Sequence, residues 1–494
     1  MRLPLAAAAI LAALAAAAAS LPLLEVPGWE LGELVALVFA LGLGPALAFG
    51  AVRRARSRGA SLASAAWRSL LAAVAVTAAP FAAAAARAAL GPCAPLHGAA
   101  LYAVTAVPSA LLATALGLAV ASLVRTRRRA ALAYAAVALA SLATTAVRAY
   151  YGPASFAHDH LFGFWPGPIY DEAQRVGPGL LLYRAATLAF TGAALALAWV
   201  RWTRPGRSPR GVPALAVAAA FAAAGVLLHR AAIPTRAEIA AELGGERSGP
   251  VCTLHFPVEK PAAEADRLER DCERDAAEIA RALQLADPPH VTVFLYRSPE
   301  EKARLVGAAH TSYTKPWLAE IHIHDAPAPH PVLRHELVHA LASVAAPPPL
   351  HVPARAGLVP AGGLIEGLAM ALDRPARDLH ARARVLRDLG HLPPVETLMG
   401  DAGFFSAAPA RAYVAAGSFI RYLIDTRGGA SVLQVYGGRD WRRAFGTALQ
   451  DLERGWQRQL DATVVPPELR RDAEARFRDP GLFGRRCARE TARD

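Results

Sequence analysis

"LRHELVHALA", residues 333–342, places leucine, valine and alanine three and four residues apart. This spacing predicts an amphipathic helix. Residues four apart share one face of a helix, so His335 and His339 can present their imidazoles to one metal ion. Glu336 projects beside them, where its carboxylate could take a proton from a water molecule at that metal. The alternative is a solvated helix that carries two histidines and no metal.

A second stretch, "GGLIEGLAMALD" (residues 362–373), supplies the acid that such a site needs. Glu366 lies inside an apolar helical run between Gly363 and Gly367. Burying an unpaired carboxylate is costly, and a bound cation removes that cost. Two histidines and one glutamate are a standard ligand set for catalytic zinc, with the fourth position left to water. We therefore predict one Zn²⁺ per chain, held by His335, His339 and Glu366.

"HELVH" followed at some distance by "GLIEGLA" resembles the gluzincin metallopeptidases of the thermolysin-like superfamily. The resemblance is closest to the membrane-tethered, peptidase MA-like bacterial proteins, and it covers roughly residues 290–440. It implies a zincin-like α+β fold, zinc-dependent hydrolysis of peptide bonds and Glu336 as the general base. By the same resemblance, "AEIHIHD" (319–325) is similar to the edge strand that lines the substrate cleft.

The resemblance extends to "YVAAGSFIRYLID" (413–425), which is similar to a helix whose tyrosine binds the tetrahedral intermediate in aminopeptidase-like gluzincins. It implies that Tyr413 stabilises the oxyanion, with Tyr422 as the alternative; packing of both rings in the core remains open. The spacing from His339 to Glu366 is longer than in the aminopeptidase branch, and no Gly-x-Met-Glu-Asn-like signature is present. These departures weigh against aminopeptidase activity, and the choice between endopeptidase and exopeptidase stays open. The proline-rich insert 346–362 is expected to be a surface loop with His351 solvated.

The first half of the chain, residues 1–231, is predicted to be an all-α transmembrane domain. It contains seven apolar stretches of roughly twenty residues, the length that a helix needs to cross about 30 Å of hydrocarbon. The first stretch could instead be a cleaved signal peptide. The stretches are 4–24, 31–52, 69–90, 99–124, 130–150, 178–201 and 212–231.

Arginines without neighbouring acids fill alternate loops between these stretches, and such loops face the cytoplasm. Everything after about residue 232 is then extracytoplasmic, in the periplasm or exterior of a bacterial inner membrane. The loop arginines are Arg53, Arg54, Arg56, Arg58 and Arg68, then Arg125, Arg127, Arg128 and Arg129, then Arg201, Arg204, Arg207 and Arg210.

All four cysteines lie outside the arginine-rich loops, as expected where an oxidising compartment lets thiols pair. Cys93 lies in an outward loop, whereas Cys252, Cys272 and Cys487 lie in the second half. Cys252 falls on a predicted strand and Cys272 on the buried stripe of the next helix, so a disulfide between them is reasonable. Sequence alone leaves the pairing open.

The net charge of +13 comes largely from the arginine loops, which serve topology and contact anionic lipid headgroups. We therefore exclude nucleic acid as a partner and expect a peptide or protein substrate and the lipid bilayer. The sequence makes no prediction about oligomeric state.

Residues 235–494 change to periodic, punctuated sequence, which indicates a separate α+β domain. Strands are predicted at 251–258, 290–298 and 317–325, with a helix at 265–283. After the His-Glu motif we predict only helices, and a cleft between sheet and helices. These helices are expected near 364–388, 409–427 and 440–478.

Two further features have competing interpretations. His322 and His324 lie two apart on one strand face and could form a second metal site, although no partner ligands are evident. The outward loop 158–172 is rich in histidine, acid and aromatic residues. It is interpreted as an interfacial aromatic loop, and a lid or docking surface for the second domain is the alternative.

Two functions follow for the whole chain. The first is a membrane-anchored zinc metallopeptidase, and the second is a membrane sensor, transporter or scaffold whose peptidase-like domain binds without cleaving. Glu336 between the two histidines favours the enzyme, because a pure binding site needs no base. An intramembrane protease is disfavoured, since Arg334, Glu320 and Asp325 surround the motif with charge.

Overall fold

The computed structural model describes residues 2–124, 126–165, 172, 174–202, 211–355, 359–374, 378–400, 403–478 and 487. The chain divides into two compact units. Unit 1 comprises residues 1–236 with 303–309 and Cys487, and unit 2 comprises 237–302 and 310–484. Among the loop residues named above, Arg125, Arg204, Arg207, Arg210 and positions 166–171 lie outside the described residues.

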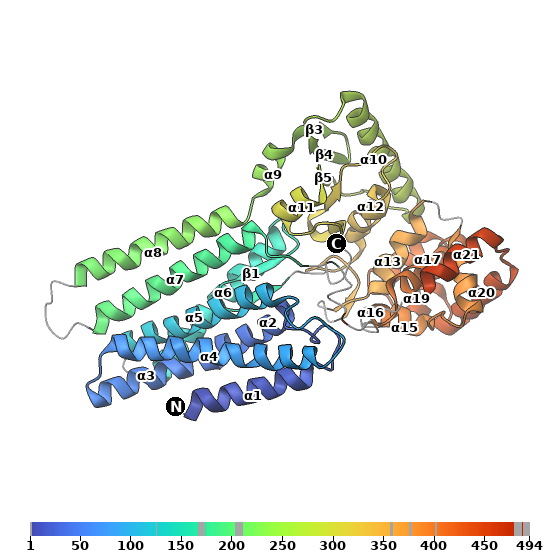
Figure 1. Ribbon diagram of the computed structural model, residues 1–494. Coiled ribbons are helices and arrows are strands. Elements are labelled where there is room, and N and C mark those ends of the chain that lie inside the picture. Colours follow the sequence, from blue (N-terminus) through green and yellow to red (C-terminus); the bar gives the residue numbers. More distant parts are fainter. Residues whose placement is uncertain are drawn as a thin grey trace. The chain divides into compact units, whose positions relative to one another are not determined.

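Unit 1 is a bundle of long helices that run side by side (Figure 1). Within the described chain, six helical segments are long and apolar enough to cross a membrane. The prediction of a helical first half is therefore confirmed, and the apolar lengths agree with a membrane domain. Its helices are α1 (Arg2–Ala18), α2 (Trp29–Val38), which continues through the π-helical η1 (Phe39–Leu43) into α3 (Gly44–Arg58), α4 (Leu62–Ala89), α5 (Ala99–Leu123), α6 (Arg127–Tyr151), α7 (Pro178–Trp202) and α8 (Gly211–Ala232).

The first of the seven predicted stretches is not among these six segments. α1 has 17 residues, which is about 25 Å of helix against about 30 Å of hydrocarbon. The predicted stretch ran on to residue 24, but the chain turns from Ala19 onward. Pro22 disfavours a helical conformation at the residue before it, which accounts for the early end.

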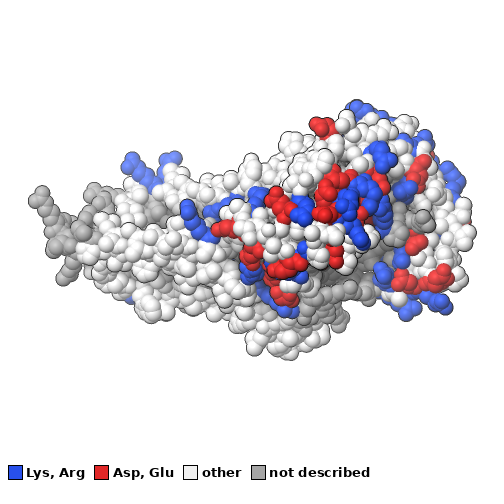
Figure 2. All heavy atoms as spheres, turned by 90° about the horizontal axis from the view of Figure 1, so that it is seen from above, with Lys and Arg blue, Asp and Glu red and all other residues white. Residues whose placement is uncertain are grey.

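Small residues let the helices of unit 1 approach closely. A Cβ atom at Gly44 would lie 2.8 Å from the Cβ of Ala113, and one at Gly117 would lie 2.8 Å from the Cβ of Ala48. These contacts join α3 to α5. In Figure 2, charged side chains are dense over unit 2 and sparse along the apolar helices of unit 1.

The outward loop begins with a short antiparallel hairpin of β1 (Ala157–Asp159) and β2 (Gly163–Trp165). Asp159 is buried. One of its carboxylate oxygens, Oδ1, accepts hydrogen bonds from the amides of Leu161 and Phe162 at 2.7 and 2.9 Å. Ser141 and Thr145 of α6 donate hydrogen bonds to Oδ2 of the same carboxylate at 3.0 and 2.7 Å. The acid therefore ties the hairpin to α6 within unit 1. The lid and docking interpretations of the loop stay predictions.

Unit 2 contains a five-stranded mixed sheet in the order β3-β4-β5-β7-β6. Strands β4, β5 and β7 are parallel, and the two outer strands are antiparallel to their neighbours. The three predicted strands are confirmed as β4, β5 and β7, whereas polar β3 and three-residue β6 were not predicted. The strands are β3 (Gly244–Ser248), β4 (Cys252–Pro257), β5 (Val291–Tyr296), β6 (Tyr313–Lys315) and β7 (Glu320–His324).

One face of the sheet forms the core of unit 2 with α10 and α12. Leu254, Val293 and Ile321 are fully buried there. The helices of this half are α9 (Arg236–Leu243), α10 (Ala262–Leu283), α11 (Pro299–Val306) and α12 (Leu333–Ala342), with the short turns η2 (Pro316–Leu318) and η3 (Ser343–Ala345).

A helical lobe follows the sheet (Figure 1). The predicted helix 409–427 is confirmed, while 364–388 and 440–478 are each interrupted; Pro466, for example, precedes a new helix. The hairpin of β8 (Ala354–Arg355) and β9 (Val359–Pro360) shows that the prediction of helices alone was wrong. The helices are α13 (Gly362–Leu372), α14 (Leu379–Asp388), α15 (Val395–Met399), α16 (Gly403–Ser406), α17 (Pro409–Arg427), α18 (Gly429–Tyr436), α19 (Trp441–Phe445), α20 (Leu449–Ala462) and α21 (Pro467–Phe477).

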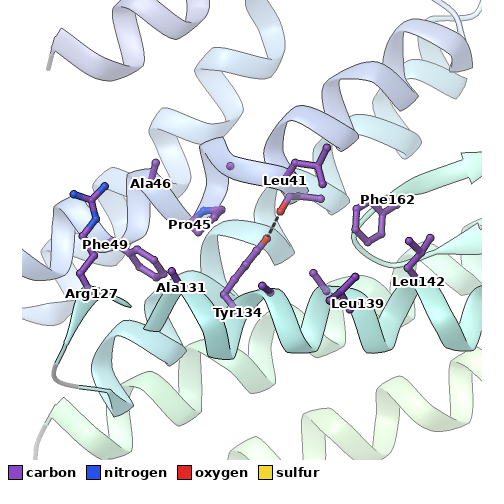
Figure 3. Close-up of a pocket in the computed structure, with 14 residues that line it drawn as sticks. Leu41, Pro45, Ala46, Phe49, Arg127, Ala131, Tyr134, Leu139, Leu142 and Phe162 are labelled. Atoms are coloured by element: carbon purple, nitrogen blue, oxygen red, sulfur yellow. Dashed lines mark hydrogen bonds between the residues drawn. The ribbon is translucent and has the colours of Figure 1, made fainter. Parts of the chain in front are cut away.

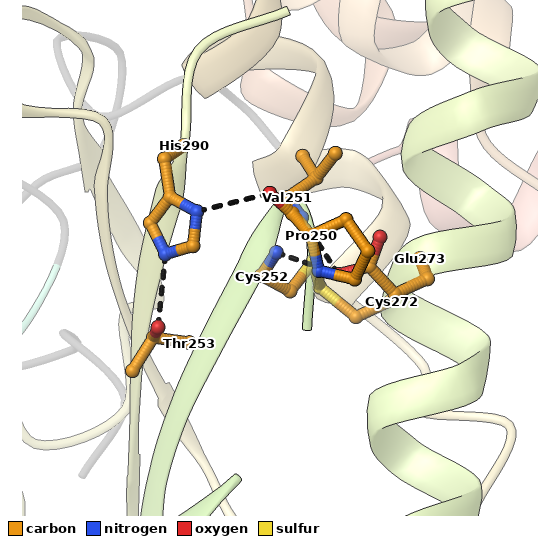
Figure 4. The surroundings of a disulfide bond; sticks show 7 residues. All are labelled: Pro250, Val251, Cys252, Thr253, Cys272, Glu273 and His290. Carbon is orange, nitrogen blue, oxygen red and sulfur yellow. Dashed lines mark hydrogen bonds between the residues drawn. A yellow bond between two sulfur atoms is a disulfide. The ribbon is translucent and has the colours of Figure 1, made fainter. Parts of the chain in front are cut away.

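All four cysteines form disulfides, Cys252 with Cys272 and Cys93 with Cys487. The first, which we considered reasonable from the sequence, ties β4 to α10 (Figure 4). Beside it, Oε1 of Glu273 accepts hydrogen bonds from the amides of Val251 and Cys252 at 2.9 and 2.8 Å. Strand and helix are therefore joined at one point by a covalent bond and by two hydrogen bonds to a carboxylate.

Replacing Cys252 and Cys272 together by alanine should destabilise unit 2 by about 3 kcal/mol, because the bond closes a loop of about twenty residues in the unfolded chain. Urea unfolding of a 237–478 fragment, followed by circular dichroism, would measure the loss. The wild-type fragment treated with a reductant is the control and should match the double variant. Equal stability of oxidised and reduced fragments would contradict the expectation.

Candidate metal centre

The helix α12 forms because its apolar residues face the core of unit 2. Leu333, Leu337 and Leu341 are buried in that core. Its first turn is capped by the ring of His330, whose Nδ1 accepts hydrogen bonds from the amides of residues 332 and 333 at 3.3 and 3.1 Å. On the face away from the core, His335 and His339 come side by side, with ring centroids 5.0 Å apart. The predicted pair is therefore presented on one helix face.

Glu366 reaches these histidines from α13, in which the two glycines nearest to it permit close packing. A Cβ atom at Gly363 would lie 2.0 Å from the carbonyl oxygen of Leu398, and one at Gly367 would lie 3.0 Å from Cγ1 of Ile420 on α17. Neither site has room for a larger residue. The glycines that flank Glu366 in the sequence thus fix α13 against its neighbours.

The three predicted ligands meet at one point. Their ligand atoms all lie within 4.8 Å of one another. Oε2 of Glu366 lies 3.4 Å from Nε2 of His335 and 3.6 Å from Nε2 of His339. A tetrahedral zinc with bonds of 2.0–2.1 Å separates its ligand atoms by about 3.3 Å. The residues therefore fit a zinc ion in both chemistry and spacing.

The charges at this point already stabilise a cation. Burial lowers the pKa of His335, but the hydrogen-bonded carboxylate of Glu366 and the nearby Glu336 outweigh it and raise the pKa to about 9. Burial also raises the pKa of Glu366, but the two imidazoles outweigh burial and hold that pKa well below its ordinary value. A negative carboxylate thus faces a site where positive charge is favoured.

Glu336 is held in place by a residue of the outer strand β6. The side chain of Glu336 is almost fully buried. The hydroxyl of Thr314 donates a hydrogen bond to Oε2 of Glu336 at 2.7 Å and lies 3.2 Å from the carbonyl oxygen of the same residue. The carboxylate beside the three ligands is therefore oriented by the edge of the sheet, and Glu336 is not one of the residues in the cluster that could hold a metal ion.

Two further residues support the ligands. Oδ2 of Asp373 lies 3.9 Å from Nδ1 of His335, the ring nitrogen that does not face Glu366. Arg334 donates from Nε to the carbonyl oxygen of Leu372 at 2.7 Å. Its Nη1 forms ion pairs with two acids of α10, Asp275 and Glu278, at 3.0 and 2.8 Å. Arg334 therefore ties α10, α12 and the end of α13 together around the site.

Asp373→Asn should weaken zinc binding by about 10- to 100-fold, because partners of a ligand's second ring nitrogen orient the ring and raise its basicity. Competition with a fluorescent chelator would measure the affinity. Asp287→Asn is the matched control, since Asp287 is an exposed acid in the turn before β5. Unchanged affinity in the Asp373 variant would show that this carboxylate does not support His335.

The structure gives the other candidates different surroundings. His322 is fully buried, with its ring nitrogens 2.7 Å from the Tyr296 hydroxyl and 2.9 Å from Oε1 of Glu320. It is a core histidine whose nitrogens are both engaged. In the described parts of the chain, the cluster of side chains that could hold a metal ion is the one formed by the three predicted ligands. It includes neither His322 nor His324. Nδ1 of His351, predicted to be solvated, lies 3.4 Å from the carbonyl oxygen of Ser343.

Tyr413 is half-buried, and its ring packs on Phe404 at a centroid distance of 5.2 Å. Tyr422 is likewise packed against the core, near Gly455. These contacts agree with the packing alternative, and the oxyanion role of Tyr413 stays a prediction. Tyr436 on α18, not singled out from the sequence, is buried, and its hydroxyl has no hydrogen-bond partner among the residues that the structure describes. Burial, and then the Glu366 carboxylate, raise its pKa.

The assignment of "AEIHIHD" as the edge strand was wrong. These residues form β7, which lies between β5 and β6, and the edge next to α12 is β6. Three residues are too few to show the alternation by which a strand is recognised in a sequence. Thr314 therefore gave no signal. Asp373 did give one, since its spacing of seven from Glu366 predicts the same helix face, although α13 ends one residue before it.

Compared with known proteins, the chain matches no protein-family model, and no curated protein or solved structure shows significant similarity to it. The functional argument therefore rests on the residues and geometry of this site.

Proposed function

We propose that the chain is a membrane-anchored, zinc-dependent metallopeptidase that hydrolyses peptide bonds. The observation that carries the proposal is the convergence of His335, His339 and Glu366 at zinc-like spacing, with the carboxylate of Glu336 held beside them by Thr314. A site that only binds a metal has no need of a second carboxylate that is not a ligand. The proposed fold of unit 2 is that of a gluzincin.

Each residue then has a defined role. Zinc, when bound, supplies a Lewis acid that polarises a water molecule and the scissile carbonyl. Glu336 takes the proton of the attacking water and passes it to the leaving amine. Thr314 keeps the carboxylate of Glu336 pointed at that water, and Asp373 orients the ring of His335. Tyr413 is proposed to donate a hydrogen bond to the oxyanion.

We further propose that unit 2 lies on the extracytoplasmic side of a bacterial inner membrane. Arginine-only loops on alternate sides of the helices support this orientation. Two disulfides that use all four cysteines support an oxidising compartment for unit 2 and for the loop that carries Cys93. The substrate would then be an extracytoplasmic peptide or protein.

The full chain, purified in detergent, tests the proposal by metal analysis together with an assay against an unbiased peptide library. We expect about one zinc per chain and cleavage that a chelator abolishes and added zinc restores. Zinc binding without cleavage of any library peptide would favour the sensor, transporter or scaffold. The sites of cleavage would also distinguish an endopeptidase from an exopeptidase.

A further inference from the structure

Unit 1 contains a groove of about 440 Å³ that runs along one face of α6 (Figure 3). Its other wall is the π-helical η1 with the first turns of α3, and Phe162 of the outward loop lies at one end. Apart from Arg127 and the Tyr134 hydroxyl, the lining side chains are apolar. The lining residues are Ala40, Leu41, Gly42, Pro45, Ala46, Phe49, Arg127, Ala131, Tyr134, Ala135, Ala138, Leu139, Leu142 and Phe162.

The groove exists because both walls carry small residues at the positions that face it. Ala131, Ala135 and Ala138 of α6 lie opposite Gly42 and Ala46, so no large side chain fills the space. The π-helical turn widens the opposite wall, and such turns occur frequently at functional sites.

Tyr134 secures this wall without filling the groove. Its hydroxyl donates a hydrogen bond to the carbonyl oxygen of Ala40 in η1 at 2.9 Å. The ring is buried. The wide turn is therefore a stable feature of the wall, braced from α6.

One positively charged side chain, that of Arg127, lies at one end of the groove. Arg127 begins α6, and in Figure 3 it lies at the opposite end from Phe162 and Leu142. Its guanidinium makes no ion pair or hydrogen bond with any described residue. Arg56 of another loop, by contrast, donates to the carbonyl oxygens of Ala121 and Ser122 at 3.0 and 3.3 Å. Arg127 is thus available to an external anion, next to the positive end of the helix dipole.

The groove is long enough to hold one lipid chain. The lining positions on α6 run from Arg127 to Leu142, which is about 22 Å along a helix. One leaflet contributes about 15 Å of the hydrocarbon core. The outer flank of α6 is also apolar and open, with Leu132 and Val137 exposed at 63% and 44%. A groove of this kind lies open to the surrounding acyl chains.

We propose that this groove binds one phospholipid with an anionic headgroup, its acyl chain along α6 and its phosphate at Arg127. The charge at one end and the apolar length behind it are complementary to that ligand and to its orientation in the arginine-side leaflet. The proposal rests on the helices of unit 1 lying in a membrane, and it is independent of the peptidase function of unit 2.

Native mass spectrometry of the full chain in a neutral detergent, titrated with dioleoyl phosphatidylglycerol or dioleoyl phosphatidylcholine, tests the proposal. We expect one phosphatidylglycerol retained per chain. Arg127→Gln should weaken its binding about fivefold, the effect of one basic residue near a lipid surface, and should weaken phosphatidylcholine less, because the choline cation offsets the charge of the phosphate. Ala135→Trp should fill the groove and remove both lipids.

Two matched variants control for general effects. Arg128→Gln removes a cation from the same helical turn, and Ala136→Leu adds bulk at the next position of α6, yet neither residue lines the groove. Both should retain lipid like the wild type, and thermal unfolding should show all four variants folded. The proposal would be overturned if Arg127→Gln and Ala135→Trp both retained phosphatidylglycerol as well as the wild type does. So would competition by inorganic phosphate alone, or a dimer of the chain that Ala135→Trp dissociates without loss of lipid.

Discussion

Glu336→Gln should leave zinc in place and slow peptide hydrolysis by at least about a thousandfold. General-base catalysis contributes about 10²- to 10⁴-fold, and a base that also delivers the proton to the leaving amine lies toward the upper end of that range. Glutamine keeps the size of the side chain and can still accept the hydrogen bond that Thr314 donates. It removes only the basicity. Because Glu336 is not one of the three ligands, zinc content should stay near one per chain.

The measurement pairs zinc content with kcat/KM on a peptide identified in the library assay. Glu468→Gln is a matched control, since Glu468 lies in the exposed first turn of α21, and it should keep full activity. A Glu336→Gln variant that cleaves as fast as the wild type would place the activity outside this site. A variant that loses zinc as well would show that Glu336 holds the metal or the fold.

The metal ligands were predictable because their signal is local and chemical. The interval of four between His335 and His339 places both on one face whatever the tertiary structure, and an acid within an apolar helix calls for a partner. Sequence spacing did not say that α13 would pack beside α12. Gly363 and Gly367 pack α13 against other neighbours, the carbonyl oxygen of Leu398 and the side chain of Ile420 on α17, and neither glycine signals the contact with α12.

The sequence did not reveal features that depend on a short strand or helix and on its contacts with distant residues. β6 has three residues and no periodic pattern, so both the edge of the sheet and the role of Thr314 were missed. The helical lobe was read as long helices, since periodicity continues across a break that a proline introduces. At the other end of the chain, Ala-rich composition carried the first apolar stretch past Pro22, where the helix has already ended.

His335→Ala and Glu366→Ala should each weaken zinc binding by more than the 10- to 100-fold that a supporting partner costs. Each removes one of three protein ligands, and a site with two ligands no longer holds the tetrahedral arrangement that catalytic zinc requires. Elemental analysis of the purified chain, followed by chelator competition, would measure the loss. Peptide hydrolysis should disappear with the metal.

The Glu366 variants separate coordination from packing. Glu366→Gln keeps the side chain that α13 presents to α12 but removes its charge, so it should lose zinc while the chain stays folded. His391→Ala is the matched control for histidine removal, because His391 is exposed in the turn after α14, and its zinc content should equal that of the wild type. Zinc that persists in both His335→Ala and Glu366→Ala would show that the metal binds elsewhere. The proposed mechanism would then lose its Lewis acid, and Glu336 would be a buried acid held by Thr314 with no water to activate.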